Sequence, residues 1–319
     1  MTTMVGASPQ ALAPEKFRDP DVTARGEPRA KVGLTGLETL WFNTGTLCNL
    51  ACAGCYIESS PKNDRLAYLT RAEMRAYLDE IARDRLPTRL VGFTGGEPFM
   101  NPELIGMLDD VLGRGLDALV LTNAMKPMRK VEDGLLLLGR RYGARLTVRV
   151  SVDHYGQDVH ERERGRNTWQ PTIDGLAWLA RNGFEVHVAG RMLSGETETE
   201  LRAGYATLFA GMGVPIDAAD PVRLMIFPEM DPGHDVPEIT EACWGILGRS
   251  AESVMCATSR MVVKRKGSHA PVVVACTLLP YDERFELGAT LASAAGPVAL
   301  NHRRCAAFCV LGGAACSRS

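Results

Sequence analysis

Three cysteines on one short stretch are the residues with the clearest capacity for chemistry. Cys48, Cys52 and Cys55 fall within eight residues, at the spacing Cys-x3-Cys-x2-Cys. Three thiolates at this spacing can hold three corners of a cubane iron–sulfur cluster, which leaves the fourth iron without a protein ligand. A metal with an open position can bind a substrate, whereas closed structural sites normally use four ligands. The spacing therefore indicates a reactive cluster, and a zinc loop or three unrelated core thiols are the alternatives.

A glycine-rich motif follows at the end of the next expected strand. The apolar run 89–94 leads directly into Gly95-Gly96-Glu97-Pro98. Glycines allow the backbone to approach a ligand closely, and Glu97 supplies a carboxylate at the strand end. Alone, the motif predicts no more than a turn. One β/α unit after the three cysteines, it indicates a ligand site.

The two motifs together resemble the signatures of the radical S-adenosylmethionine (SAM) superfamily, over about residues 36–230. In that family the amino and carboxylate groups of SAM chelate the open iron. One electron from the reduced cluster then cleaves SAM to methionine and a 5′-deoxyadenosyl radical, which abstracts a hydrogen atom from the substrate. The resemblance implies that a [4Fe–4S] cluster is bound by Cys48, Cys52 and Cys55. It also implies that the amino group of SAM is contacted by Gly95, Gly96 and Glu97.

Polar residues at three later strand ends are further candidates for SAM contacts. Asn123, Ser151 with Asp153, and Arg191 stand where expected strands reach the barrel mouth. Ser151 and Arg191 resemble the family's contacts to the SAM ribose and carboxylate. Polar strand ends in water are an equal alternative for each of them.

The cysteine loop departs from the family pattern at one position. Many members carry an aromatic residue immediately before the third cysteine, near the adenine of SAM, but here that residue is Gly54. Tyr56, just after Cys55, is the candidate replacement. His154-Tyr155 and the charged run 160–165 resemble the family's loop after the fourth strand. We interpret most of its charges as solvated, and residues that contact substrate are the alternative.

Strands and helices alternate along most of the chain. A capping box at Thr70 and Glu73 opens the first helix. Apolar periodicity predicts strands over 38–44, 89–94, 118–123, 145–153, 184–191 and 221–227, and helices over 70–81, 103–112, 131–141, 171–182 and 197–211. Strict alternation indicates a parallel sheet with right-handed crossovers. Six units before residue 228 predict an α/β fold, an open (β/α)6 partial barrel.

The tail contains six of the nine cysteines. Runs 260–265 and 271–275 predict a β-hairpin, with Cys256 before it and Cys276 after it, followed by Cys305, Cys309 and Cys316. This arrangement resembles the auxiliary-cluster extensions called SPASM and Twitch. Six thiols are too few for two clusters with four thiolates each, so one auxiliary [4Fe–4S] cluster in a small Twitch-like α+β domain is expected.

The choice of ligands within the tail stays partly open. Cys256, Cys276, Cys305 and Cys309 are favoured, with Cys316 as a further ligand or a free thiol. Cys243 lies in an expected helix, 240–247, and we interpret it as a buried apolar thiol. Zinc is the alternative metal, because cysteine-rich groups at such spacings also bind it.

Composition and sequence pattern indicate the partners to exclude, the cellular location and the domain boundaries. A net charge of −2 gives no electrostatic footprint for nucleic acid or an anionic membrane. No run approaches the roughly 18 apolar residues of a membrane span, and the start lacks a secretory signal. A cytoplasmic protein is therefore expected, with an N-terminal arm (1–35), the barrel (36–235) and the auxiliary domain (236–319).

The expected function is radical hydrogen abstraction from an unidentified substrate. A small metabolite is favoured, because 35 residues leave no room for a leader-binding domain ahead of the barrel. A maturase that modifies a ribosomal peptide is the second hypothesis, and a non-catalytic iron–sulfur scaffold or electron carrier is the third. The family implies an electron donor such as flavodoxin or ferredoxin. The auxiliary cluster would relay an electron, bind substrate through an open iron, or brace the barrel. The sequence assigns no general base or hydrogen donor.

Overall fold

The computed structural model describes residues 13–230 and 235–316. Much of the expected N-terminal arm, residues 1–12, thus lies outside the described residues. Within the described ranges no helix is long and apolar enough to cross a membrane.

A curved sheet forms the frame of the protein. In the described part of the chain it has nine strands in the order β10-β9-β8-β2-β3-β4-β5-β6-β7. Six of them are the predicted barrel strands, and each pairs in parallel with the next. They are β2 (Thr39–Asn43), β3 (Leu90–Thr94), β4 (Asp117–Thr122), β5 (Leu146–Ser151), β6 (Glu185–Arg191) and β7 (Leu224–Phe227). The expected α/β partial barrel is confirmed.

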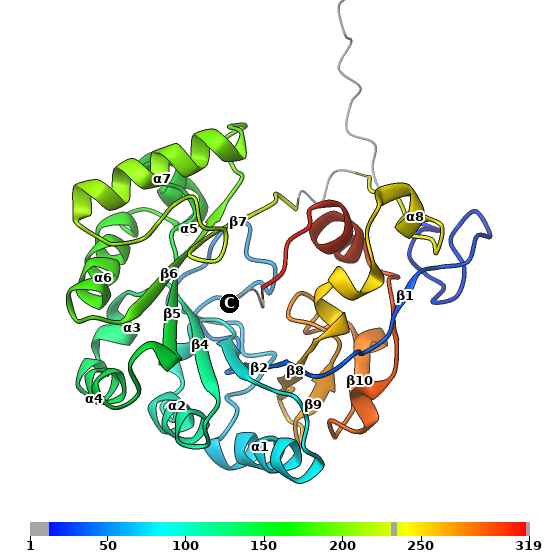
Figure 1. The fold of residues 1–319 in the computed structure, drawn as a ribbon, viewed down its shortest axis with the longest axis horizontal. Helices are drawn as coiled ribbons and strands as arrows, with labels where there is room; N and C mark the ends of the chain where they lie inside the picture. The colour runs from blue at the N-terminus through cyan, green and yellow to red at the C-terminus, as the bar shows by residue number, and fades with distance from the viewer. Residues whose placement is uncertain (1–12, 231–234, 317–319) are drawn as a thin grey trace, which may run out of the picture.

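Helices cover the outer side of this arc of strands (Figure 1). They are α1 (Arg71–Asp84), α2 (Leu104–Gly113), α3 (Lys126–Arg129), α4 (Glu132–Tyr142), α5 (Gln157–Arg164), α6 (Trp169–Arg181) and α7 (Glu198–Met212). Helix α8 (Cys243–Leu247) lies apart from this arc and packs on the tail. The predicted capping box starts α1, because Thr70 accepts from the Glu73 backbone and Glu73 accepts from the Thr70 backbone. Helix α6 begins at Trp169, before Pro171, which is tolerated there because the first-turn N–H groups have no partner within a helix.

Three local predictions need correction. The run expected as a solvated loop after the fourth strand forms α5, with Asp158 in its first turn and Arg162 and Arg164 in its last turn, which suits the helix dipole. Helix α8 is shorter than the expected 240–247. Cys243 is only half-buried, not a core thiol, and its Sγ accepts from the Thr240 backbone at 3.4 Å.

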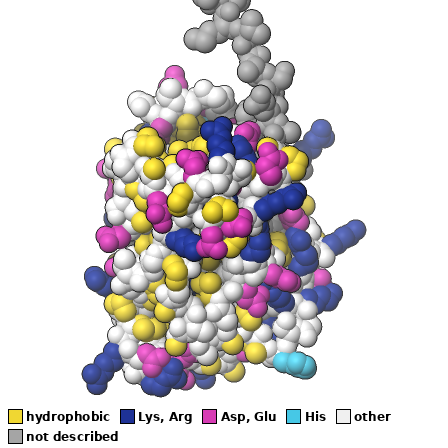
Figure 2. Space-filling model, turned by 90° about the vertical axis from the view of Figure 1, so that its right-hand side faces the viewer, with side chains coloured by type: hydrophobic (Ala, Val, Ile, Leu, Met, Phe, Trp, Pro, Cys, Tyr) yellow, Lys and Arg dark blue, Asp and Glu magenta, His cyan; other side chains and the backbone are white. Residues whose placement is uncertain are grey.

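The tail joins the barrel sheet. The predicted hairpin forms as β8 (Ser259–Val263) and β9 (Val272–Val274), with β10 (Glu286–Gly288) beyond it. Strand β8 pairs in parallel with β2, so the hairpin continues the sheet at its first barrel strand. The arm packs on the tail through β1 (Lys31–Val32) against β11 (Val298–Ala299). Figure 2 views the molecule from this side and shows Lys/Arg and Asp/Glu side chains interspersed over the surface.

Two apolar clusters fill the two sides of the strands. Leu40 and Phe42 of β2 pack in the cluster that includes the covering helices, and Trp41 between them packs in the cluster that includes the tail cysteines. This alternation is the period of two expected of a strand buried on both faces. The tail is therefore packed inside the arc, where it forms one wall of the barrel mouth.

Candidate active site

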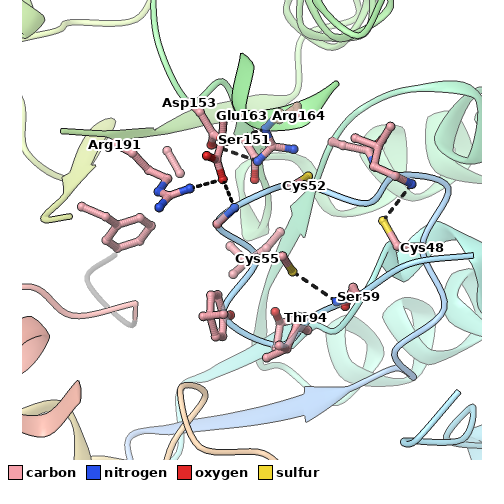
Figure 3. A pocket seen from close by; sticks show the side chains of 18 of the residues that line it. Cys48, Cys52, Cys55, Ser59, Thr94, Ser151, Asp153, Glu163, Arg164 and Arg191 are labelled. Atoms are coloured by element: carbon pink, nitrogen blue, oxygen red, sulfur yellow. Dashed lines mark hydrogen bonds and ion pairs between the residues drawn. The ribbon is translucent and has the colours of Figure 1, made fainter. Parts of the chain in front are cut away.

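A cavity at the barrel mouth brings the sequence motifs together. Its walls include Cys48, Cys52 and Cys55, and its empty volume is about 1140 Å³, including open solvent at the mouth. The other predicted SAM-binding residues that reach its walls are Tyr56, Gly95, Gly96, Asn123, Ser151 and Arg191. Figure 3 shows the cysteine loop facing the strand-end residues of β5 and β6 across this space.

Glu97 is placed differently from the other motif residues. It is fully buried, it is not part of the cavity wall, and its carboxylate accepts from Thr122 Oγ1 (2.7 Å) and the Asn123 and Phe99 backbones (2.9 and 3.1 Å). Burial raises the pKa of this carboxyl, against the opposing effect of these hydrogen bonds. In this arrangement Glu97 fixes the ends of β3 and β4, and its contact with SAM stays a prediction.

The cysteine loop offers a donor set that fits an iron–sulfur cluster. Backbone N–H groups of Leu50 and Ser59 point at the sulfurs of Cys48 (3.4 Å) and Cys55 (3.3 Å), as they do around cluster thiolates. Burial raises the pKa of Cys48 to about 12 and of Cys52 to about 11. Metal binding would have to supply the free energy of deprotonation.

A four-iron cluster and a single metal ion need ligands in different arrangements. No group of three or more His, Cys, Asp or Glu within residues 13–230 and 235–316 is arranged around one metal ion. In a cubane each thiolate binds a different iron atom, so the thiolates stand apart and share a cavity. All nine cysteines are free thiols.

Helix α5 anchors the cysteine loop, a role that the sequence analysis missed. The Glu163 carboxylate accepts from the Gly54 backbone at 2.6 Å and forms an ion pair with Arg191 on β6. The Glu163 carbonyl accepts from the Ala53 backbone at 2.8 Å. A Cβ at Gly54 would lie 2.6 Å from Glu163 Oε1 and 2.7 Å from the Arg191 guanidinium, so a larger residue before the third cysteine would displace the ends of these two side chains.

A buried ion pair lies behind the loop. Arg164 of α5 donates to both oxygens of Asp153 at 2.9 and 3.0 Å, and both side chains are largely buried. Burial opposes the charged form of Arg164, but the Asp153 carboxylate and the Cys52 thiol raise its pKa above the ordinary value. Both residues line the cavity, so this ion pair stands beside the cysteine loop.

Loss of one partner of this pair should be costly. Asp153→Ala leaves Arg164 buried without its carboxylate, and we expect the free energy of unfolding to fall by about 3–5 kcal/mol. Asp117→Ala, which breaks the exposed pair with Arg145, should cost less than about 1 kcal/mol. Urea unfolding of the two variants side by side tests this prediction, and equal losses would contradict it.

The tail cysteines separate into two places. Cys256, Cys276, Cys305 and Cys309 all line a second, smaller cavity of about 290 Å³ empty volume. Cys305 and Cys309 reach it from the π-helix η7 (Cys305–Leu311). Burial raises the pKa of Cys276 to about 12 and of Cys256 to about 11. The four thiols favoured from the sequence thus share one enclosed space, as the ligands of one cluster must.

Cys316, the fifth candidate, lies elsewhere. It lines the active-site cavity, and its Sγ accepts from Thr277 Oγ1 at 3.5 Å. Sequence spacing could not separate it from Cys305 and Cys309, because the turn that follows η7 decides which cavity it reaches.

Comparison with known proteins finds a matching family and two curated relatives. A family model described as "Radical SAM superfamily" matches residues 42–205. The chain is 34% identical over 143 residues to the antilisterial bacteriocin subtilosin biosynthesis protein AlbA of Bacillus subtilis (strain 168), covering 44% of this chain and 30% of AlbA. It is 29% identical over 149 residues to a GTP 3′,8-cyclase of Microcystis aeruginosa (strain NIES-843 / IAM M-2473), covering 43% and 42%. The chain thus spans less than half the length of these curated relatives.

Solved structures share the fold. Streptococcus suis SuiB bound to S-adenosylmethionine superposes with a TM-score of 0.58 at 10% identity, over 80% of this chain and 64% of SuiB. AnSMEcpe with bound AdoMet gives a TM-score of 0.56 at 15% identity, over 80% and 79%.

The family match covers more than half of the chain, and the fold and the cysteine-rich tail agree with it. Members of this family are enzymes that use a [4Fe–4S] cluster and SAM. The chain belongs to the radical SAM superfamily.

Proposed function

We propose that this enzyme cleaves SAM reductively at a cluster held by Cys48, Cys52 and Cys55 and abstracts hydrogen from a compact substrate in the same cavity. The observation that carries the proposal is that these thiols and the bare backbone of Gly95-Gly96 line one space. When bound there, the reduced cluster and SAM supply a 5′-deoxyadenosyl radical. A small redox protein such as flavodoxin or ferredoxin would supply the electron.

The chain's own residues provide the binding and the orientation. The Gly96 backbone donates to the Gly45 carbonyl at 2.8 Å and the Glu97 backbone to the Leu47 carbonyl at 3.1 Å, which ties the glycine turn to the cysteine loop. Ser151 and Arg191 stand across the cavity as candidates for the ribose and carboxylate of SAM. Because Glu163 already pairs with Arg191, that guanidinium is held in a fixed position.

The cavity size favours a substrate whose reacting part is small. SAM and the reacting part of the substrate must share this one cavity, because the cysteine loop and the glycine turn both line it. A small metabolite therefore remains the first candidate. A peptide that inserts one side chain is the second, because the AlbA relative is named for bacteriocin biosynthesis.

The tail supports a closed auxiliary cluster. Four thiols around one enclosed cavity give each iron of a cubane a protein ligand, so no iron is left for substrate. This arrangement favours electron transfer over substrate binding as the role of the auxiliary site.

The auxiliary site leads to a direct prediction. Cys309→Ser should lower the iron content of the reconstituted protein from about eight to about four atoms per chain, while Cys243→Ser, outside both cavities, should leave it unchanged. Iron and sulfide analysis checks this. Full iron content in the Cys309 variant would contradict the assignment.

The proposed function is tested by turnover of SAM alone. The anaerobically reconstituted protein, given dithionite and SAM, should release 5′-deoxyadenosine and methionine. If it releases neither with its clusters intact, and small-molecule and peptide fractions of host lysate also fail to elicit them, the proposal is wrong. The fraction that accelerates release distinguishes the two substrate candidates.

A further inference from the structure

Cys316 is a buried thiol in the active-site cavity that neither cluster site accounts for. Its residue is 4% exposed, and it lines the same cavity as the cysteine loop, whereas the four auxiliary thiols line the other. Figure 1 shows the C-terminal segment running from η7 into the middle of the arc of strands. The tail thus places the Cys316 sulfur in the cavity where the proposed reaction occurs.

The position of Cys316 relative to the two cysteine groups follows from its neighbours. It lines the same cavity as Tyr56, the residue next to Cys55. On its other side Cys316 meets Thr277, which follows the auxiliary residue Cys276. Cys316 therefore stands between the two cysteine groups, on the cavity wall formed by the tail.

Among the described residues, no acceptor is recorded for the S–H of Cys316. Thr277 Oγ1 donates to the sulfur at 3.5 Å, so this contact uses the sulfur as an acceptor and not as a donor. Arg149 Nη1 donates to the Cys316 carbonyl at 2.9 Å, which fixes the backbone at this point.

A second observation indicates that a polar ligand binds in this cavity. Ser59, another wall residue, is 5% exposed, and its hydroxyl has no hydrogen-bond partner among the described residues. Buried hydroxyls are normally satisfied, so an unpaired one on a cavity wall points to a group that the ligand supplies. The cavity wall thus contains both the protonated Cys316 thiol and the Ser59 hydroxyl, which has no hydrogen-bond partner among the described residues.

We infer that Cys316 is the hydrogen-atom donor of the reaction: its thiol returns a hydrogen to the substrate carbon after abstraction. The S–H bond, which is weaker than most C–H bonds, breaks, and a new substrate C–H bond forms. The sulfur radical left on Cys316 regains a thiol by taking one electron from the one-electron reductant that also drives SAM cleavage, and one proton from solvent. The inference rests on the proposed function and specifies its outcome.

The consequence is a defined reaction class. The hydrogen atom is abstracted on the side of the cavity formed by the cysteine loop, where SAM binds. The replacement hydrogen is donated from the side formed by the tail, where Cys316 lies. The substrate carbon then has the same oxidation state before and after, its hydrogen comes from solvent, and its configuration can invert. This outcome is an isomerisation, not the net oxidation that an electron-accepting auxiliary cluster would serve.

The test uses SAM itself as the probe, because the substrate is unidentified. In D2O the Cys316 thiol exchanges to S–D, and in uncoupled turnover without substrate the wild type should release 5′-deoxyadenosine that carries deuterium. Cys316→Ser should release unlabelled product, since its O–D bond is too strong to donate. Cys243→Ser should match the wild type. Equal label in the wild type and in Cys316→Ser would overturn the inference.

A measurement without turnover separates the donor from a cluster ligand. In the cluster-loaded protein, Cys316→Ser should retain the full iron content, whereas Cys309→Ser should lose about four iron atoms per chain. Loss of about four iron atoms from Cys316→Ser would make Cys316 a ligand and overturn the inference. If the wild type releases no 5′-deoxyadenosine even with the small-molecule and peptide fractions of host lysate, the proposed function fails, and this inference fails with it.

Discussion

Cys52→Ala should abolish release of 5′-deoxyadenosine while the fold is retained. Cys52 is one of three thiols on the loop, and two thiolates cannot hold the cubane in the geometry that leaves one iron open. Changes of residues behind metal ligands typically cost 10–100-fold, so loss of a ligand should lower the rate by more than about 100-fold. The measurement is product release by the reconstituted variant under dithionite.

A matched cysteine provides the control. Cys243 is half-buried and lies on neither cavity wall, so Cys243→Ala should release 5′-deoxyadenosine at the wild-type rate. Iron content separates loss of one cluster from collapse of the protein, since Cys52→Ala should keep the auxiliary iron. Substantial product from Cys52→Ala would refute the assignment of the loop.

Gly96→Ala should disrupt SAM binding through the backbone alone. An added Cβ would lie 2.2 Å from the Leu47 carbonyl oxygen and 2.7 Å from that of Thr46. Both contacts are with backbone, which cannot rotate away as a side chain can. Relief requires the loop before Cys48 to move, and we expect a loss of about 1–3 kcal/mol in the free energy of unfolding. SAM affinity should fall at least about tenfold, which corresponds to 1.4 kcal/mol.

Another glycine serves as the reference for this substitution. Gly211 in α7 has open space where a Cβ would be placed, so Gly211→Ala should be neutral or slightly stabilising. Equilibrium binding of SAM to the reconstituted variants, together with their unfolding curves, checks both expectations. Unchanged SAM affinity in Gly96→Ala would show that the glycine turn does not hold SAM.

Local patterns predicted the barrel well. The apolar runs that became β2 to β6 are short and buried on both faces, and each is followed by a helix with an apolar stripe, so pattern and fold agree. The capping box at Thr70 and Glu73 placed the start of α1 closely, because it is formed by residues three apart. The grouping of the cysteine loop with Gly95 and Gly96 also follows from order along parallel strands.

Long-range contacts account for what the sequence could not show. Glu163 and Arg164 were interpreted as solvated because their partners, Gly54 and Asp153, are brought close only when α5 folds back over the loop. Periodicity predicted the hairpin but not the parallel pairing of β8 with β2, since register between distant strands leaves no local signal. The place of Cys316 depends on the path after η7 in the same way.

The central claim is that one cysteine group binds SAM and the other does not. The most direct measurement is electron paramagnetic resonance of the reduced, reconstituted protein before and after SAM is added. We predict two [4Fe–4S] signals, of which one shifts with SAM and persists in Cys309→Ser, while the other is insensitive to SAM and is lost in that variant. If neither signal changes when SAM is added, the assignment of a SAM-binding cluster to Cys48, Cys52 and Cys55 is wrong.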